Sequence, residues 1–314
     1  MKKKVTLVDI ARQTGYSVNC VSRALMDADD ISDNTKRIIK EVADELGYIP
    51  NLNAASLKKG KSKIIGILYD NILNQYYNTM IYYLQKELNQ RGYCMIMYQS
   101  GQFDEEVYKQ MVSRNIDGLI SFLVPNDEVV RRIKMNNFNT VILGRKSAHI
   151  SSVYYNDFKV GYIAGETLVK KGYKKPIYLG EYESISISKQ RSEGFLQSLE
   201  DHNIVGKSYF RINEETFEEI ISNILDTEKI DSIFCFNDLI AYEVLKVLNA
   251  RKLKQVKVIG VDNIQAEIKY PFTITTIGHN KRKTIDDAID ILFKQMNSSQ
   301  NEVTYLVEDV YLVE

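Results

Sequence analysis

The sequence predicts two units of different fold class: an N-terminal all-α helix-turn-helix head and an α/β core of two parallel-sheet lobes. Residues 1–49 have the spacing of three short helices, whereas from residue 63 short apolar runs alternate with amphipathic stretches. The charge changes at the same place: of 41 basic and 41 acidic residues, 12 and 8 respectively fall in residues 1–63, which leaves 29 and 33 for the remainder. A basic head on an acidic body is typical of a nucleic-acid-binding module joined to a second domain.

Composition and length limit the classes of protein that fit. The 314 residues are 44% hydrophobic with only 4 Pro and 16 Gly, which suffices for two or three packed domains. No apolar run approaches the roughly 18 to 20 residues of a membrane-spanning helix, and no apolar stretch follows the basic start as it does in a signal peptide. We therefore expect a cytoplasmic protein with no membrane partner. The three Cys and three His lie far apart along the chain, so we expect neither a metal nor another cofactor.

Two short helices joined by a tight turn open the head. Thr6 is suited to be an N-cap with Asp9 as its acidic partner, and apolar residues then follow at i, i+3, i+4 and i+7. Gly15 supplies the turn, and Ser17 caps a second helix over Val18–Leu25. Such a pair is the helix-turn-helix unit, whose second helix enters the major groove of DNA. The exposed face of that helix carries Val18, Asn19, Ser22 and Arg23.

A third helix completes the head, because Ser32 caps it, an apolar face follows and Gly47 ends it. On the second helix, Arg can bond both guanine acceptors, Asn can pair with adenine and Val can touch a thymine methyl. A good bidentate pair discriminates between bases by about 1–3 kcal/mol. The alternative interpretation is a small helical bundle whose polar face is merely solvated.

Four motifs run through the head at fixed spacings: Val5–Ala11, Gly15–Ser17, Val21–Leu25 and Glu45–Asn51. In these motifs the head resembles the LacI/GalR-type (lactose-repressor) family of regulators over residues 5–57. The resemblance implies that Val18, Asn19 and Arg23 read bases, while Ser17 and Ser22 hold phosphates. We expect Thr6 to belong to the same DNA-contacting set.

The next segment, Asn51–Leu57, resembles the hinge helix of that family. In the family this segment orders only on DNA, pairs with its copy in the dimer partner and inserts a Leu into the minor groove. The resemblance implies that Leu57 is the wedge, that the small Ala54 allows close approach and that Asn51 also contacts DNA. Ala55 stands where the family often has Arg. The alternative interpretation is a plain interdomain linker.

Alternating strands and helices predict the architecture of the core. Buried strands are expected over Ile64–Leu68, Cys94–Tyr98, Gly118–Phe122, Val141–Leu143, Ile177–Leu179, Ile233–Phe236 and Val258–Val261. Regular β-α alternation indicates parallel sheets covered by helices on both faces. We divide the chain into the head (1–49), hinge and linker (50–62) and core (63–314). The first lobe of the core is expected at about 63–156 plus 281–298, and the second at about 157–280 plus 299–314.

Ligands of open α/β sheets bind beyond the carboxyl ends of the strands. The core motifs Arg191–Phe195, Phe236–Asp238, Gly260–Asn263 and Thr275–Ile277 resemble the family's core, which is similar to a two-lobed periplasmic sugar-binding protein. The resemblance implies that Arg191 donates to ligand oxygens, that Asp262 accepts from two neighbouring hydroxyls and that Asn237 does one of each. An aromatic ring would stack on a sugar face. The expected effector-binding residues are Asn74, Tyr76, Tyr77, Arg145, Arg191, Phe210, Asn237, Asp262 and His279.

Each of these residues also has a purely structural interpretation. Arg191 could form a helix-surface ion pair, His279 could be a satisfied buried histidine, and the tyrosines could simply pack. Asp238 is expected to be a helix cap rather than a ligand contact. Gly144 stands where many sugar-responsive members carry Asp, and with Arg145 beside it this leaves open a phosphorylated or anionic ligand.

Together these features predict a transcriptional repressor of carbohydrate uptake or catabolism genes that binds a palindromic operator as a homodimer. Its partners would be operator DNA, a second copy of itself and a sugar or sugar derivative. The alternative is a catabolite-type regulator whose main signal is a phosphorylated carrier protein or a sugar phosphate. An enzyme is disfavoured because no phosphate-binding glycine fingerprint follows the first strand and the strand ends offer no catalytic groups.

Overall fold

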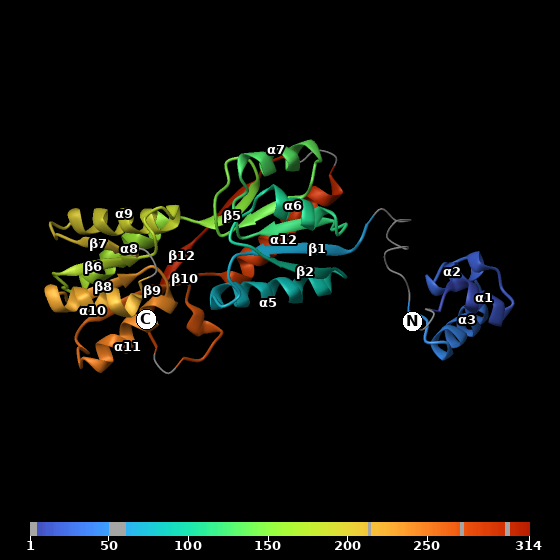
Figure 1. Cartoon of the computed structure of the whole chain (residues 1–314), viewed down its shortest axis with the longest axis horizontal. Coiled ribbons are helices and arrows are strands. Elements are labelled where there is room, and N and C mark those ends of the chain that lie inside the picture. The colour runs from blue at the N-terminus through green and yellow to red at the C-terminus, as the bar shows by residue number, and fades with distance from the viewer. Residues whose placement is uncertain (1–4, 50–60, 213–214, 271–272, 299–301) are drawn as a thin grey trace. The chain divides into compact units, whose positions relative to one another are not determined.

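The computed structural model describes residues 5–49, 61–212, 215–270, 273–298 and 302–314 (Figure 1). The chain divides into two compact units, Met1–Ser62 and Lys63–Glu314. The expected hinge residues Asn51, Ala54 and Leu57 lie outside the described residues. Within the described ranges, no helix is both long enough and apolar enough to cross a bilayer.

The head consists of α1 (Leu7–Thr14), α2 (Val18–Leu25) and α3 (Asp33–Glu45), so the predicted second helix is confirmed over its full length. The ends of the helices are set by local hydrogen bonds. The Thr6 backbone N–H and hydroxyl both donate to the Asp9 carboxylate, at 2.9 and 2.7 Å. Gly15 takes the left-handed φ of 75° that ends α1, and the Ser17 hydroxyl oxygen accepts from the Cys20 N–H at 3.1 Å.

The core of the head lies where the three helices meet. Its fully enclosed members come from all three helices and are Ile10, Ala11, Val21, Ala24, Ile39 and Ala43. These residues belong to the predicted apolar faces. Because apolar residues occupy the inner faces of the three helices, the polar residues of α2 lie on the outside of the head.

The first lobe is a six-stranded sheet of order β11-β5-β4-β3-β1-β2 in which all pairs are parallel. Its elements are β1 (Ile64–Tyr69), α5 (Gln75–Gln90), β2 (Cys94–Gln99), α6 (Glu105–Val112), β3 (Gly118–Ser121), α7 (Asp127–Met135), β4 (Thr140–Leu143), β5 (Ser151–Tyr155), α12 (Lys281–Asn297) and β11 (Tyr305–Glu308). Side chains of β1 alternate between two cores: Ile65 and Ile67 pack with α5 and α12, and Leu68 packs with α6 and α7.

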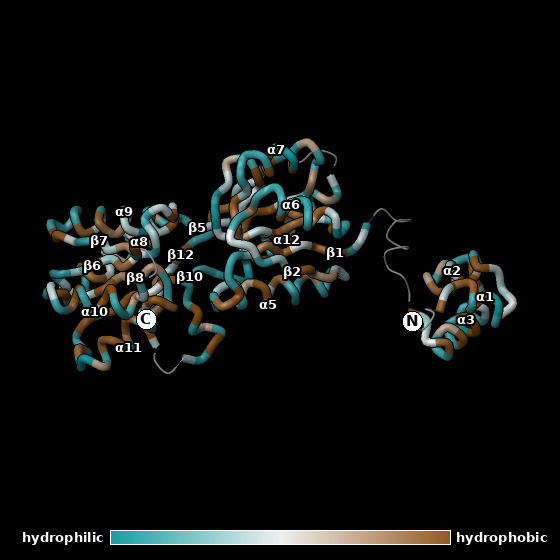
Figure 2. The backbone as a smooth tube through the Cα atoms, in the orientation of Figure 1, coloured by the Kyte–Doolittle hydropathy of each residue, from teal (hydrophilic) through white to brown (hydrophobic). Residues whose placement is uncertain are grey.

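The second lobe is a six-stranded sheet of order β12-β10-β9-β8-β6-β7. Its elements are α8 (Asp157–Lys170), β6 (Pro176–Gly180), α9 (Ser186–Glu200), β7 (Lys207–Phe210), α10 (Phe217–Thr227), β8 (Ser232–Cys235), α11 (Asp238–Ala250), β9 (Lys257–Val261), the 3-10 turn η1 (Ile264–Ala266), β10 (Thr275–His279) and β12 (Val310–Val313). Helices α8 and α9 cover one face, and α10 and α11 the other (Figure 1). Figure 2 shows the apolar residues gathered along the strands of both sheets.

The C-terminal segment corrects the predicted boundary between the lobes. Residues 299–314 were expected in the second lobe, but β11 pairs in parallel with β5 of the first. Only β12 joins the second sheet, antiparallel to β10. Strands β11 and β12 are edge strands with polar or exposed positions. Hydrophobic periodicity alone cannot assign such a strand to one sheet rather than the other. The chain therefore returns from the first lobe to the second at Asp309.

Candidate effector pocket and DNA-contacting helix

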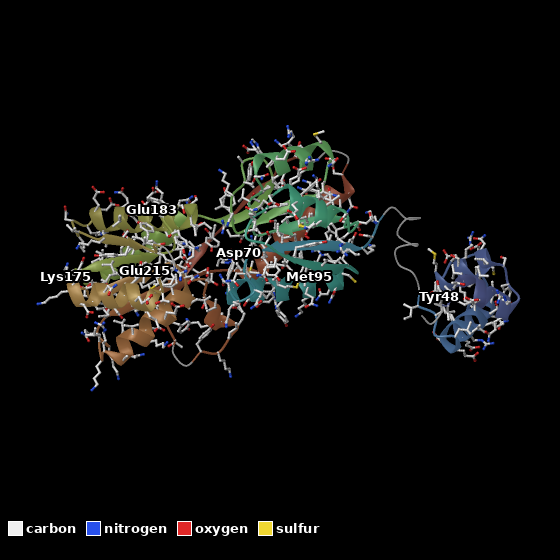
Figure 3. The ribbon with its side chains drawn as sticks, viewed as in Figure 1. Tyr48, Asp70, Met95, Lys175, Glu183 and Glu215 are labelled. Carbon is white, nitrogen blue, oxygen red and sulfur yellow. The ribbon has the colours of Figure 1, made fainter. Side chains whose placement is uncertain are left out.

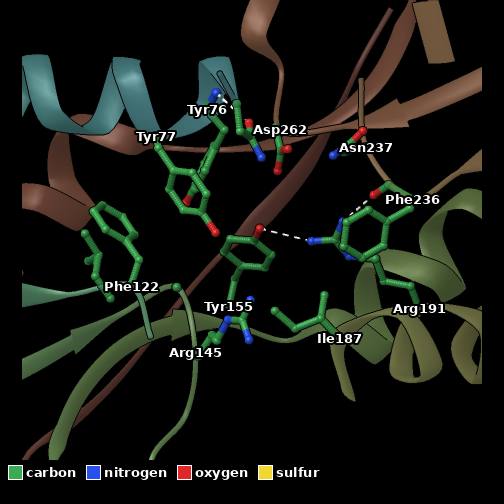
Figure 4. Close-up of a pocket in the computed structure, with 13 residues that line it drawn as sticks. Tyr76, Tyr77, Phe122, Arg145, Tyr155, Ile187, Arg191, Phe236, Asn237 and Asp262 are labelled. Carbon is green, nitrogen blue, oxygen red and sulfur yellow. Dashed lines mark hydrogen bonds between the residues drawn. The ribbon is translucent and has the colours of Figure 1, made fainter. Parts of the chain in front are cut away.

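A cavity of about 70 Å³ lies at the carboxyl ends of the strands and is lined from both lobes (Figure 4). The structure brings seven of the expected effector-binding residues into its lining: Asn74, Tyr76, Tyr77, Arg145, Arg191, Asn237 and Asp262. Small-molecule sites have volumes of about 300–1,000 Å³. A ligand larger than a few water molecules therefore requires the lobes to part or the lining side chains to move.

The first lobe contributes aromatic rings from the start of α5. Asn74 is the N-cap of that helix, where its side-chain oxygen accepts from the Tyr76 N–H at 3.0 Å. The Tyr77 ring meets Phe122 edge to face at a centroid distance of 5.1 Å. Burial and the negative charge of Asp70 (Figure 3) raise the pKa of Tyr77 to about 12, although Arg145 opposes them. Tyr77 therefore presents a neutral hydroxyl to the cavity at physiological pH.

The second lobe contributes a buried guanidinium from α9. Arg191 Nε donates to Asp157 Oδ1 at 2.8 Å, and Nη2 donates to the Tyr155 hydroxyl at 3.1 Å. Nη1 donates to the backbone oxygen of Phe236. Both charged groups of the ion pair are almost fully enclosed, so the helix-surface alternative for Arg191 is wrong. Removing one member of a buried ion pair leaves an uncompensated charge, which typically costs about 3–5 kcal/mol.

Asp262 lies on the turn after β9, with a φ of 98° in the left-handed region. Its side chain is buried among the lining residues. Burial raises the pKa of the Asp262 carboxyl, while Arg191, Lys281 and a hydrogen bond from Tyr155 oppose the rise. The Asp262 carboxyl group therefore offers acceptor oxygens in a site largely enclosed by protein, where a hydrogen bond is stronger than in water.

The start of α11 supplies the side-chain amide of Asn237 to the cavity and a carboxyl group, that of Asp238, which holds a neighbouring turn. Asn237 is the N-cap, since its side-chain oxygen accepts from the Ile240 N–H at 3.0 Å, and its amide nitrogen is not used for the cap. Asp238 was predicted to be that cap, which is wrong. Instead Asp238 accepts from the Ile264 N–H at 2.9 Å and from the Thr276 hydroxyl at 2.6 Å. It fixes the turn that carries Asp262.

The head presents the expected DNA-contacting side chains on the outside of α2. Val18, Asn19 and Arg23 are exposed, and Ser22 is half-buried. Arg23 Nη2 lies 2.5 Å from Asp30 Oδ1. The Thr6 hydroxyl donates to Asp9 and the Ser17 hydroxyl accepts from the Cys20 N–H. Both residues lie at helix N-termini, where phosphates bind well. No group of three or more His, Cys, Asp or Glu suited to a metal occurs in the described part of the chain.

Residues 6–51 match the family described as bacterial regulatory proteins, lacI family, and residues 165–312 match the periplasmic binding protein-like domain. The chain carries a LacI-family DNA-binding domain followed by a periplasmic binding protein-like domain. The transcriptional repressor PurR of Actinobacillus pleuropneumoniae serotype 3 is 26% identical over 95% of this chain and 93% of its own length. The regulator MalR of Clostridium butyricum is 26% identical over 99% and 98%. The crystal structure of the lac repressor dimer bound to operator and the anti-inducer ONPF superimposes with a TM-score of 0.84 at 20% identity, covering 99% and 98% of the two chains.

The proteins matched are transcriptional regulators, which speaks against the enzyme alternative. Two of the expected effector contacts lie outside the lining of the cavity. The His279 ring lies behind it: Nε2 is 3.2 Å from the Tyr76 hydroxyl, and Nδ1 is 3.0 Å from the Thr284 hydroxyl. Burial, with Lys281 and Arg191, lowers the pKa of His279 to about 3, so it is a neutral, satisfied histidine. Phe210 packs edge to face on Tyr178 at 6.0 Å, because β7 is the edge strand that closes the core of the second lobe.

The lining also contains residues that sequence reasoning missed: Phe122, Leu143, Tyr155, Ile187 and Phe236. Tyr155 is the most consequential, because its hydroxyl connects Arg191 with Asp262. It is the last residue of β5, a strand whose Ser-Ser start hides it from a search for apolar runs. The signal that could have found it is its place before Asn156, the N-cap of α8.

The core should lose stability as pH rises between about 4 and 7 on account of Asp238. Burial and the charge of Asp262 raise the pKa of Asp238 from 3.8 to about 7. In this range the folded state binds the proton and the unfolded state does not, so unfolding is favoured with rising pH by up to a few kcal/mol. Urea unfolding of the wild type and Asp238→Asn at pH 4.5 to 8 measures the difference. The unfolding free energy of the wild type should fall relative to that of Asp238→Asn as pH rises. If the difference between the two unfolding free energies does not depend on pH, the assignment to Asp238 is contradicted. His279 titrates in both proteins, so its contribution cancels in the difference between their unfolding free energies.

Proposed function

We propose that this LacI-family chain is a transcriptional repressor that binds a near-palindromic operator as a homodimer and changes its affinity when a small effector enters the pocket. The observation that carries the proposal is the pocket lined from both lobes, on a core that follows a helix-turn-helix head. The relatives support the same function, since they are a transcriptional repressor, a transcriptional regulator and a lac repressor dimer bound to operator.

The effector is a sugar or a similarly hydroxylated molecule. Asp262 accepts from neighbouring hydroxyls, while the amides of Asn74 and Asn237 both donate and accept. Rings of Tyr76 and Phe236 offer apolar faces for the ring of the ligand. The enclosed volume is only about 70 Å³, so entry of such a ligand requires the lobes to part or the lining side chains to move. Parting of the lobes changes the angle between them. A coupling of about 1–3 kcal/mol to DNA binding is ordinary for such a transition.

On the DNA side, two heads read half-sites about one helical turn apart, as the symmetry of a dimer requires. Val18, Asn19 and Arg23 reach base edges, and Thr6, Ser17 and Ser22 hold phosphates. Ala54 and Leu57 act in the minor groove, as the resemblance implies, and Asn51 also contacts DNA. Because a repressor must reach the chromosome, we place this protein in the bacterial cytoplasm.

Affinity selection of fragmented genomic DNA by the full chain, followed by sequencing at one stated salt concentration, tests the function. Salt is fixed because the phosphate contribution alone changes affinity by orders of magnitude. We expect a shared palindrome upstream of a few transport or catabolic genes. Absence of any enriched sequence, with and without a panel of sugars, would reject the proposal.

A second effector class, a sugar phosphate or another anion, is favoured by one observation. Arg145 lines the cavity, and no carboxylate of the described residues lies within ion-pair distance of its guanidinium. Arg191, by contrast, is already neutralised by Asp157.

The Arg145→Gln substitution discriminates between the two classes. If the effector is anionic, its affinity should fall at least about tenfold, because a hydrogen bond to a charged group is worth about 1.5–3 kcal/mol. Binding of neutral sugars should change little. Isothermal titration of paired ligands, such as glucose and glucose 6-phosphate, measures this in the wild type and the variant. Equal affinities of the wild type for both members of each pair would rule out the anionic class.

A further inference from the structure

An acidic residue outside the helix-turn-helix unit contacts the arginine expected to read a base. Arg23 stands in the last turn of α2, and Asp30 lies in the segment between α2 and α3. The Nη2–Oδ1 distance is 2.5 Å, and the two side chains are 46% and 55% exposed. The pair therefore lies on the surface of the head, and its Arg23 member stands on the same helix as the other expected base contacts.

We propose that Asp30 is a positioning residue that holds Arg23 ready for base recognition and thereby increases the discrimination between operator and other DNA. The inference rests on the proposed function, because it concerns how Arg23 performs the reading. An ion pair this exposed contributes little to the stability of the fold. Its effect has to be sought in binding.

The first part of the effect is pre-organisation. A free arginine side chain has many rotamers, and ordering it at an interface reduces affinity. Asp30 lies closest to Nη2, at one end of a guanidinium that has five N–H donors. The other donors stay available for the two acceptors of a guanine in the major groove. Asp30 can thus remain bound to Arg23 while Arg23 binds the base.

The second part is electrostatic. A carboxylate beside the recognition helix repels phosphates, which weakens binding to every DNA sequence alike. By itself this repulsion leaves the ratio of specific to nonspecific affinity unchanged. The discrimination comes from the ordered contact between Arg23 and guanine, which forms only on the operator and compensates for the repulsion there. Complexes with other sequences stay weak.

The same segment contains a matched control. Lys40 Nζ lies 2.5 Å from Asp27 Oδ1, with side chains 44% and 66% exposed. Asp27 therefore resembles Asp30 in its charge, its exposure and its ion-pair distance. Its partner lies on α3 and not on the recognition helix. Asp27→Asn and Asp30→Asn remove the same charge from the same segment.

The experiment compares these two variants in the full chain. Dissociation constants are measured at one salt concentration for the duplex selected by the wild type and for a scrambled duplex of equal length. Asp30→Asn should lower the ratio of specific to nonspecific affinity about fivefold, in line with the cost of ordering one long side chain. Asp27→Asn should leave the ratio within about twofold. Selection of binding sites by Asp30→Asn should show relaxed preference at one base pair per half-site.

Two further variants separate positioning from a general charge effect. Asp30→Glu keeps the carboxylate and should restore most of the lost discrimination. In an Arg23→Ala background, Asp30→Asn should have no further effect on the ratio, since coupling requires both residues. The inference is overturned if Asp30→Asn and Asp27→Asn change the ratio equally, or if the effect of Asp30→Asn persists without Arg23. A wild type that prefers no sequence at all would instead overturn the proposed function.

Discussion

Replacing Asp262 by Asn should abolish the response to effector while leaving DNA binding intact. The substitution keeps the size of the side chain and suits the backbone, because Asn tolerates the left-handed φ of 98° better than most residues. It removes the charged acceptor from the cavity lining. Two hydrogen bonds to a charged group are worth about 3 kcal/mol or more, so effector affinity should fall at least about 100-fold.

The operator affinity of Asp262→Asn without effector should match that of the wild type. The head is a separate compact unit, and Asp262 lies in the core. Burial raises the pKa of Asp262, so loss of its charge should not destabilise the core. A thermal melt in the absence of ligand checks this point.

The measurement uses a panel of sugars, sugar phosphates and nucleobases, the last because planar rings could stack on the aromatic lining. Thermal shift of the wild type identifies which compounds bind. Operator affinity is then titrated against the best compound for the wild type, Asp262→Asn and Asp309→Asn. Asp309 is almost fully exposed and should behave as the wild type. A response of Asp262→Asn at the wild-type concentration would place the effector site elsewhere.

The sequence predicted best where local rules decide the structure. Helix α2 has its predicted bounds, and Ser17 makes its predicted cap, because a cap depends on residues three positions apart. The rule that ligand groups follow the carboxyl ends of strands led to Tyr76, Arg145 and Asp262, since it needs only the strand and not its neighbours. The roles of these residues in binding remain predictions.

The misses share a different origin. Whether His279 points into the cavity or behind it depends on Tyr76, which is 203 residues away in the sequence. Phe210 could stack on a ligand or close a core, and the position of β7 at the sheet edge decides between them. The assignment of β11 to the first lobe depends on its pairing with β5, a contact between distant segments. Composition and periodicity carry no information about such contacts.

The Gly161→Ala substitution should be among the most destabilising Gly-to-Ala changes in the core. Gly161 of α8 lies against α9, where an added Cβ would stand 1.9 Å from the backbone oxygen of Arg191 and 2.8 Å from the Phe195 nitrogen. The contact is reciprocal, since a Cβ on Gly194 would stand 1.9 Å from the backbone oxygen of Phe158. The two helices touch through their backbones, so the methyl group can be accommodated only if the helices separate.

Separation of α8 and α9 would break the geometry at the pocket. Asp157 is the first residue of α8 and Arg191 belongs to α9, so the ion pair between them spans the two helices. Ala favours an isolated helix over Gly by about 1 kcal/mol. Overpacking costs about 1–3 kcal/mol, and disturbing a buried ion pair up to about 3–5 kcal/mol. The net change should therefore be a loss of at least about 2 kcal/mol in the free energy of unfolding.

Urea unfolding of the full chain and effector titration measure the two consequences of Gly161→Ala. The control is Gly101→Ala, where an added Cβ meets no atom within 4 Å and the unfolding free energy should stay within about 0.5 kcal/mol of the wild type. If Gly161→Ala also stays within that range, the helices are not in backbone contact. If it is destabilised but keeps wild-type effector affinity, the α8–α9 contact does not position Arg191. Loss of both stability and affinity is expected, because Gly161 lies against the backbone of Arg191. The Arg191 side chain contacts both Asp157 and Tyr155 at the pocket.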